Sequence, residues 1–276
     1  MLCFITLDAT MKYAMGSYSL VQVTWARFFF ATVFAVCICL PRLRFYTQSS
    51  NYGLQVVRSL LLMTTTGLFN AGINHLPLAT ATTIMFLSPI LATVLAIALL
   101  GEIVGLRRWF GIAMGFVGAV IVVQPWQGLS ATFSTGALFM VAAAFTNACY
   151  QIATRHVRRD DPLTSLLFTA TAGAIVTSAL LPGHWSMPDA SGWALLVGSG
   201  VFGWLGHLCL IRALQAAPAS VVTPFSYSSL LWATLFGFAI WRELPDRYTI
   251  IGASLIVFAG LYIFLRERHL AARAAV

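Results

Sequence analysis

The chain has 276 residues, of which 59% are apolar and 9% are charged, and its mean hydropathy is +0.86. Ordinary soluble domains carry roughly 25% charged residues, so this chain has too few polar side chains to cover a soluble globule. The net charge of +8 does not indicate nucleic-acid binding, because the basic residues lie between apolar segments rather than on one face. In lipid, apolar side chains can face outward while each helix satisfies its own backbone hydrogen bonds. We therefore expect an all-α integral membrane protein.

Ten apolar segments follow one another along the chain, each bounded by turn formers or charges. About 17 to 25 apolar residues can cross a bilayer. The predicted transmembrane helices cover residues 1–16, 20–40, 54–74, 79–100, 106–124, 134–155, 162–181, 191–213, 219–241 and 246–265. The first is short, since 16 residues rise only about 24 Å as helix. The short connections leave no room for a domain outside the membrane.

Basic residues are distributed unequally between the two sets of alternating connections. One side receives Arg42, Arg44, Arg58, Arg107, Arg108, Arg155, Arg158, Arg159, Arg212, Arg266, Arg268 and Arg273. The other side receives only Lys12, Arg27, Arg242 and Arg247. Such a bias marks the cytoplasmic side, and an even number of spans then puts both termini there. The absence of N-x-[ST] acceptors and the short Arg-rich loops favour a multi-pass protein of a bacterial cytoplasmic (inner) membrane.

Two stretches, residues 75–102 and 216–243, have the same layout: a Pro, an uncharged apolar span and a closing Glu. Aligned at an offset of 141, residues 77–123 and 218–264 share eight identities. They are Pro77/Pro218, Thr82/Thr223, Ser88/Ser229, Ala92/Ala233, Thr93/Thr234, Ala98/Ala239, Glu102/Glu243 and Gly111/Gly252. The shared order of a Pro before the span, a Glu after it and a Gly in the next helix is stronger evidence for a repeat than the number of identities, some of which would occur by chance. We expect two halves of five helices, residues 1–124 and 134–265, followed by a basic cytoplasmic tail at 266–276.

Five is an odd number, so corresponding elements of the two halves cross the membrane in opposite directions. Inverted-topology repeats of this kind are characteristic of secondary transporters, whose substrate sites lie near the midplane between the repeats. A channel or a structural protein has less need of this symmetry.

The ten short spans, the Pro-to-"GE" phrase ending at Glu102, its partner ending "WRE" at Glu243, and Gly111 and Gly252 together resemble the drug/metabolite transporter superfamily, EamA branch. The resemblance covers nearly the whole chain. It implies a 5+5 inverted repeat around a cavity walled mostly by helices 3, 4, 8 and 9, and many bacterial members export amino acids or related metabolites. The chain departs from the pattern at Arg242, where the first copy has Gly101, and in its short first span.

Helical spacing predicts the cavity wall. Thr82, Met85, Phe86 and Pro89 fall at i, i+3, i+4 and i+7 of the fourth span and share one face. The repeat carries the first three onto Thr223, Ser226 and Tyr227 of the ninth span. Hydroxyls, a thioether and aromatic rings suit a small amphipathic solute. The alternative is that these residues form ordinary contacts between helices.

Further polar residues lie inside the sixth and eighth spans. Asn147 and Tyr150, with Gln151, and Trp204 and His207 are candidates for substrate binding, because polar groups in lipid normally face the bundle interior. His207 is either a proton-coupling group or a hydrogen-bonded structural histidine.

Three charged residues of the first two spans remain. Asp8 and Lys12 stand at i and i+4, so they form a candidate charge pair that either binds the two ends of a zwitterion or neutralises itself near the outer mouth. Arg27 either pairs with a substrate carboxylate or extends its guanidinium to the membrane–water interface, and we favour the second alternative.

Four residues are candidates for gating. Pro89 and Pro224 remove backbone hydrogen bonds in or near the repeated helices and are plausible hinges. Glu102 and Glu243 end these helices near the interfaces, where we expect structural or gate-latching roles.

No phosphate-binding loop, HExxH, GxSxG or metal-ligand cluster occurs in the sequence, so we expect no ATP-driven pump, enzyme, cofactor or metal site. The sequence predicts an alternating-access exporter of small amphipathic metabolites, with amino acids, including aromatic and hydrophobic ones, as the leading substrates. An exporter or carrier of cationic drugs, vitamins or nucleotide-like and methyl-donor metabolites is the alternative, and a membrane enzyme or passive channel is more distant. The expected partners are a small-molecule substrate and the bilayer, with a monomer favoured over a dimer.

Overall fold

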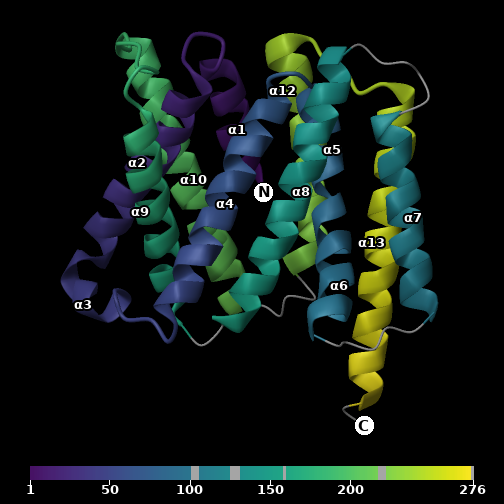
Figure 1. Cartoon of the computed structure of the whole chain (residues 1–276). Helices are drawn as coiled ribbons and strands as arrows, with labels where there is room; N and C mark the ends of the chain where they lie inside the picture. The colour runs from purple at the N-terminus through teal and green to yellow at the C-terminus, as the bar shows by residue number, and fades with distance from the viewer. Residues whose placement is uncertain (101–105, 125–130, 158–159, 217–221, 275–276) are drawn as a thin grey trace.

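A computed structural model describes all residues except 101–105, 125–130, 158–159, 217–221 and 275–276. In this part of the chain every regular element is helical (Figure 1). The elements are α1 (Leu2–Ala14), α2 (Leu20–Cys39), η1 (Leu40–Arg42), α3 (Leu43–Tyr46), α4 (Tyr52–Ile73), α5 (Leu78–Met85), α6 (Leu87–Leu100), α7 (Leu106–Val123), α8 (Ala131–His156), α9 (Pro162–Leu180), α10 (Ala190–Ala216), η3 (Thr223–Tyr227), α12 (Ser228–Trp241) and α13 (Arg247–Ala274). The predicted all-α membrane fold is thus confirmed.

Each of the ten predicted segments contains helix, although not all of these helices reach the length of a span. Among the residues that the structure describes, six stretches are long and apolar enough to cross a membrane: Leu20–Arg42, Tyr52–Ile73, Leu78–Ala98, Thr135–Thr154, Pro162–Leu180 and Ala190–Leu210. Trp109–Val123, Phe225–Trp241 and Arg247–Tyr262 are shorter apolar helices, and α1 has 13 residues. The chain is therefore a multi-pass membrane protein, while the count of ten crossings stays a prediction.

Local sequence explains where several helices begin. Ser19, Asn51 and Asp161 each accept a hydrogen bond from a backbone N–H in the first turn of α2, α4 and α9 respectively. Side-chain oxygens at this position satisfy donors that the helix itself leaves unpaired. The connection after α2 was expected to be a loop, but it contains the two short helices η1 and α3 at one end of the bundle (Figure 1).

The repeated helix is broken in both copies. The predicted continuous span at 79–100 is two helices, because α5 ends at Met85 and α6 begins at Leu87. Pro89 explains the break, since its ring clashes with the carbonyl four residues earlier while a proline is tolerated in the first turn of a new helix. In the second copy a 3₁₀ turn containing Pro224 precedes α12. Phe86 and Tyr227, which occupy the same position of the two copies, lie at these breaks.

The helix contacts repeat when the two halves are exchanged. In this exchange α1 corresponds to α8, α2 to α9, α4 to α10, α6 to α12 and α7 to α13. Accordingly α4 packs on α8 as α10 packs on α1, α4 on α9 as α10 on α2, and α6 on α8 as α12 on α1. The pairs α2 with α9 and α7 with α13 map onto themselves. Two equivalent halves related by a twofold axis are expected to give this pattern.

Close contacts join the two halves, at the equivalent residues Phe86 and Tyr227 and between α7 and α13. The rings of Phe86 and Tyr227 lie 5.1 Å apart between centroids. Where α7 and α13 run side by side at one edge of the bundle (Figure 1), a Cβ on Gly118 would meet the Gly252 carbonyl oxygen at 2.8 Å, and one on Gly252 would meet the Gly118 carbonyl oxygen at 2.5 Å. Small residues at such positions let helices approach closely in lipid.

The termini lie at different depths. The amino terminus is at mid-height inside the bundle, whereas α13 carries the carboxyl end past one end of the other helices (Figure 1). We call the end of the bundle where α1, α4 and α12 finish the Lys12 end, and the end where α4 begins the Arg58 end, after the residues described next.

Candidate functional site

A cavity of about 400 Å³ lies in the middle of the bundle between the two halves. Helices α1, α2, α4, α5, α6, α8, α10 and α12 and the turn η3 all contribute to its wall. The lining residues are Met1, Phe4, Ile5, Asp8, Arg27, Leu62, Thr65, Thr66, Phe69, Thr82, Met85, Phe86, Pro89, Asn147, Tyr150, Gln151, His207, Leu210, Ser226 and Ser229. The third, fourth, eighth and ninth predicted spans, which were expected to form the wall, correspond to α4, α5 with α6, α10, and η3 with α12, and all of them line the cavity. Helices α1, α2 and α8 line it as well.

Most residues of the predicted cavity wall line this cavity. The stripe of Thr82, Met85, Phe86 and Pro89 runs along it from α5 into α6, so the helical spacing held across the break. Asn147 and Tyr150 come from α8, His207 from α10 and Ser226 from η3. The structure therefore brings together residues that are up to 144 positions apart in the chain, from Thr82 to Ser226.

Five candidates are placed differently or cannot be placed. Trp204 lines a separate space of about 30 Å³ between α2, α9 and α10, together with Arg27 and His207. Tyr227 contacts the cavity residue Phe86, and its hydroxyl occupies the space that a Cβ on Gly260 would need. The side chains of Thr223 and Pro224, as well as the whole of Glu102, lie outside the described residues.

Hydrogen bonds already hold several of the cavity groups. Asn147 Nδ2 and Gln151 Nε2 both donate to Ser88 Oγ, at 3.0 and 2.9 Å. His207 Nδ1 lies 2.8 Å from the carbonyl oxygen of Gly203; because a carbonyl can only accept, Nδ1 carries the proton. The His207 ring also packs at a steep angle against the ring of Phe4, with 5.1 Å between the centroids. This bonding matches the structural interpretation of His207, although its ring also lines the cavity.

In contrast, the hydroxyl of Thr82 is buried and has no hydrogen-bond partner among the residues that the structure describes. Leaving a buried hydroxyl unpaired costs on the order of 1–3 kcal/mol. Thr82 lines the cavity, but the oxygen itself is covered by protein atoms.

Sequence reasoning missed one wall of the cavity. Leu62, Thr65, Thr66 and Phe69 of α4 fall at i, i+3, i+4 and i+7, the spacing that identified the stripe on α5. The same argument would have found them. Arg27 was expected at the interface, but it lines the cavity from α2 with its guanidinium 5.5 Å from the ring of Phe28. That expectation was wrong because Arg27 lines two internal spaces of the bundle that it shares with His207 of α10.

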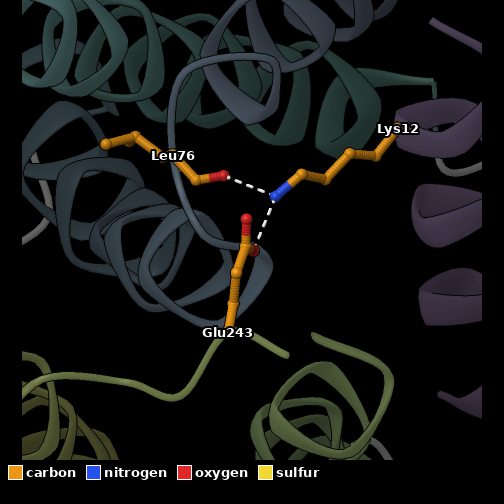
Figure 2. A network of polar contacts seen from close by, with 3 residues as sticks. All are labelled: Lys12, Leu76 and Glu243. Atoms are coloured by element: carbon orange, nitrogen blue, oxygen red, sulfur yellow. Dashed lines mark hydrogen bonds and ion pairs between the residues drawn. The ribbon is translucent and has the colours of Figure 1, made fainter. Parts of the chain in front are cut away.

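The predicted pairing of Asp8 with Lys12 is also corrected by the structure. Lys12 Nζ donates instead to Glu243 Oε2 at 2.8 Å and to the carbonyl oxygen of Leu76 at 3.0 Å (Figure 2). Asp8 points one turn deeper, into the cavity. Lys12 pairs with Glu243 rather than with Asp8 because this ion pair satisfies both charges at a partly buried position where three chain segments meet.

This contact closes the Lys12 end of the bundle. Lys12 belongs to α1, Leu76 to the turn between α4 and α5, and Glu243 follows α12, so one ammonium joins both halves (Figure 2). Its Nζ also lies 4.8 Å from the centroid of the Trp241 ring. Beneath it, buried apolar residues such as Ala9 and Ile73 pack together between the ion pair and the cavity. We call the three-residue contact of Lys12, Leu76 and Glu243 the latch.

Arg242 gives the latch its shape. It ends α12 with φ 59° and ψ 23°, the left-handed conformation in which helices usually place a glycine. At the same position of the first copy the sequence has Gly101, and glycine is the residue type that adopts this conformation most readily. In the second copy an arginine adopts it, and the chain turns so that Glu243 faces Lys12.

Many more hydrogen bonds join the helices at the Arg58 end. Arg58 of α4 is only 4% exposed, and its guanidinium donates to Tyr150 Oη, Thr154 Oγ1, Gln55 Oε1, Thr169 Oγ1 and the carbonyl oxygen of Ser165. These acceptors belong to α4, α8 and α9. Because Tyr150 lines the cavity, Arg58 fixes one cavity side chain in place.

The same network reaches the connection between α8 and α9 through Asp160. Its carboxylate accepts hydrogen bonds from Ser49 Oγ, the Ser50 N–H and Gln55 Nε2. Partial desolvation opposes ionisation of Asp160, but these hydrogen bonds outweigh it and hold the pKa of Asp160 well below its usual range. We call the residues joined by Arg58 and Asp160 the Arg58 network.

Comparison with known proteins agrees with this architecture. The model of the EamA-like transporter family matches the chain twice, at residues 1–124 and 134–266. The chain belongs to the EamA-like transporter family. It is therefore a member of a family of small-metabolite transporters, and the predicted family is confirmed.

Several curated EamA-type relatives match over most of their length. An S-adenosylmethionine uptake transporter of Rickettsia prowazekii is 27% identical over 95% of this chain and 88% of its own length. A riboflavin transporter of Vibrio cholerae is 27% identical over 95% and 89%. A pseudopaline exporter of Pseudomonas aeruginosa is 28% identical over 68% and 66%. A solved crystal structure shares the fold with a TM-score of 0.69 at 20% identity, over 98% of this chain and 97% of that one.

Proposed function

We propose that this EamA-type protein is an alternating-access secondary transporter in which two inverted five-helix halves share the central cavity. The observation that carries the proposal is the cavity itself, which lies where the halves meet and is sealed at the Lys12 end by the latch. The helix contacts that repeat on exchange of the halves support two equivalent conformations. The breaks at Phe86 and before α12 supply the hinges, with Pro89 and Pro224 beside them.

The orientation follows from the distribution of basic residues. The Arg58 end carries the Arg-rich connections, so we place it in the cytoplasm of a bacterium and the latch on the outer side of the inner membrane. Substrate then enters the cavity from the Arg58 side while the latch is closed. We take a monomer as the working unit, since both halves of the site lie in one chain.

The leading substrates are amino acids, including aromatic and hydrophobic ones, carried outward. The cavity combines the aromatic rings of Phe69 and Phe86 with the polar residue Thr82 and with two opposite charges, Asp8 and Arg27. Aromatic walls hold an apolar group, and a few polar groups fix its orientation.

A second candidate is a larger metabolite with a nucleoside-like or flavin ring system, carried inward. The names of the relatives from Rickettsia prowazekii and Vibrio cholerae favour it. The same aromatic residues would stack on such a ring or hold a sulfonium cation.

Counterflow into proteoliposomes separates these candidates. Vesicles preloaded with unlabelled phenylalanine, methionine, threonine, S-adenosylmethionine or riboflavin are given the labelled form of the same compound. We expect saturable, exchange-stimulated uptake of at least one, with amino acids ahead of riboflavin. Flux that neither saturates nor exchanges would mean a passive channel, and no flux above empty vesicles for any compound would reject the proposal.

A further inference from the structure

Asp8 and Arg27 face the same cavity at the same depth. They belong to α1 and α2, which are joined by the short turn at residues 15–19. Asp8 lies six residues before Ala14 and Arg27 lies seven residues after Leu20. At 1.5 Å rise per residue, each is about 10 Å from the Lys12 end of its helix.

The two charges are near one another without being joined. Each acts electrostatically on the other, yet neither makes an ion pair or hydrogen bond with any other residue in the described part of the chain; Lys12, one turn from Asp8, is held in the latch. Ionised groups inside a membrane protein are costly unless they are paired or hydrated. Both side chains are only partly buried, because the cavity exposes them.

No second pair of this kind lines the cavity among the described side chains. Asp8 is the acidic side chain in the wall, and Arg27 is the arginine. The guanidinium of Arg58, which is buried next to Tyr150, already donates hydrogen bonds to five neutral acceptors. A ligand that enters the cavity therefore meets one carboxylate and one guanidinium that are still free to bind it.

We propose that Asp8 and Arg27 are separate anchors for the two ends of a zwitterion, Asp8 accepting hydrogen bonds from a ligand ammonium and Arg27 donating a bidentate pair to a ligand carboxylate. The inference rests on the proposed transport function and assigns its substrate class: molecules that carry a free α-ammonium and a free α-carboxylate. Charge-assisted hydrogen bonds of this type are among the strongest in proteins. The cavity-lining residues Thr82, Met85 and Phe86 then surround the remainder of the ligand.

Two matched series of probes test the anchors by binding to the purified full-length protein, measured by calorimetry. The first is phenylalanine, phenethylamine and 3-phenylpropanoate; the second is methionine, 3-(methylthio)propylamine and 4-(methylthio)butanoate. In each series the second compound lacks the carboxylate and the third lacks the ammonium. For the wild type we expect the zwitterion to bind at least about tenfold more tightly than either truncated compound.

Two nearly isosteric variants then assign each end. Asp8→Asn should bind the zwitterion and the compound without ammonium about equally, while it still discriminates against the compound without carboxylate. Arg27→Gln should show the reverse pattern. Thr6→Val, on α1 but outside the cavity wall, should leave both ratios unchanged, and the wild-type series remains decisive if a variant does not fold.

The inference is overturned if the wild type binds all members of a series equally or binds none of them, or if each variant weakens all three compounds by one factor. These outcomes differ from failure of the proposed function. Transport of riboflavin without binding of either amino acid would reject the anchors but keep the transporter, whereas absence of transport for every compound of the counterflow panel would reject both.

Discussion

The helices are held together in different ways at the two ends of the bundle. At the Lys12 end one ammonium, held by a carboxylate and a carbonyl, joins α1, the α4–α5 turn and α12 above a layer of apolar contacts. At the Arg58 end a buried guanidinium and a carboxylate together organise α4, α8, α9 and their connections through eight hydrogen bonds. A contact made of only a few polar groups can break at low free-energy cost, whereas a fully satisfied buried network rigidifies the elements that it joins. We therefore expect the latch to open while α4, α8 and α9 move as one body.

The largest expected effect is on stability at the Arg58 end. Arg58→Leu leaves several buried acceptors without a donor, and we expect a loss of about 3 kcal/mol in the free energy of unfolding. Thermal unfolding in detergent should show this as a large drop in the midpoint. Arg44→Leu, which removes an exposed arginine of α3, is the matched control and should change little. Equal midpoints for the two variants would remove the distinction between the ends.

At the latch we expect a smaller loss of stability than at the Arg58 end, together with a clear increase in the access of water-soluble reagents to residues beneath it. Lys12→Met breaks a half-buried ion pair, which is worth about 1 kcal/mol. With a cysteine at position 9, beneath the latch, labelling by a membrane-impermeant maleimide should become faster in Lys12→Met. The exchanged pair Lys12→Glu with Glu243→Lys should restore slow labelling in part. Unchanged labelling in Lys12→Met would show that the latch does not control access.

The third and smallest effect depends on pH. The pKa of Asp160 is lowered in the folded state, so its hydrogen bonds add stability above its unfolded pKa of about 3.9 and this stability is lost as the pH falls toward the folded value. The difference in midpoint between the wild type and Asp160→Asn should therefore be full at pH 7 and shrink below pH ~4. Asp161→Asn is the control at pH 7, because Asn caps a helix as well as Asp does. A difference that grows on acidification would contradict the assignment.

Local sequence patterns predicted the helices and most of the cavity, because hydropathy and i, i+3, i+4 spacing are properties of neighbouring residues. The same locality explains the errors. Asp8 and Lys12 were paired because they stand one turn apart, but Lys12 finds its partner 231 positions away. Arg58 was attributed to topology, since nothing near it in the chain indicates five acceptors on α4, α8 and α9. The break at Phe86 was not predicted, because a proline such as Pro89 can either kink a continuous helix or lie in the first turn of a new one, and the local sequence does not decide between the two.

Distances between spin labels test the central claim most directly. In a protein whose native cysteines are replaced, one label pair at Asn74 and Leu244 reports on the Lys12 end, and another at Tyr52 and Pro162 reports on the Arg58 network; all four positions are exposed. Electron paramagnetic resonance should show the first distance lengthening in Lys12→Met or with a transported ligand, while the second distance stays the same. A first distance that never changes, or equal changes in both, would contradict an account in which the latch is the moving gate and α4, α8 and α9 form a rigid body.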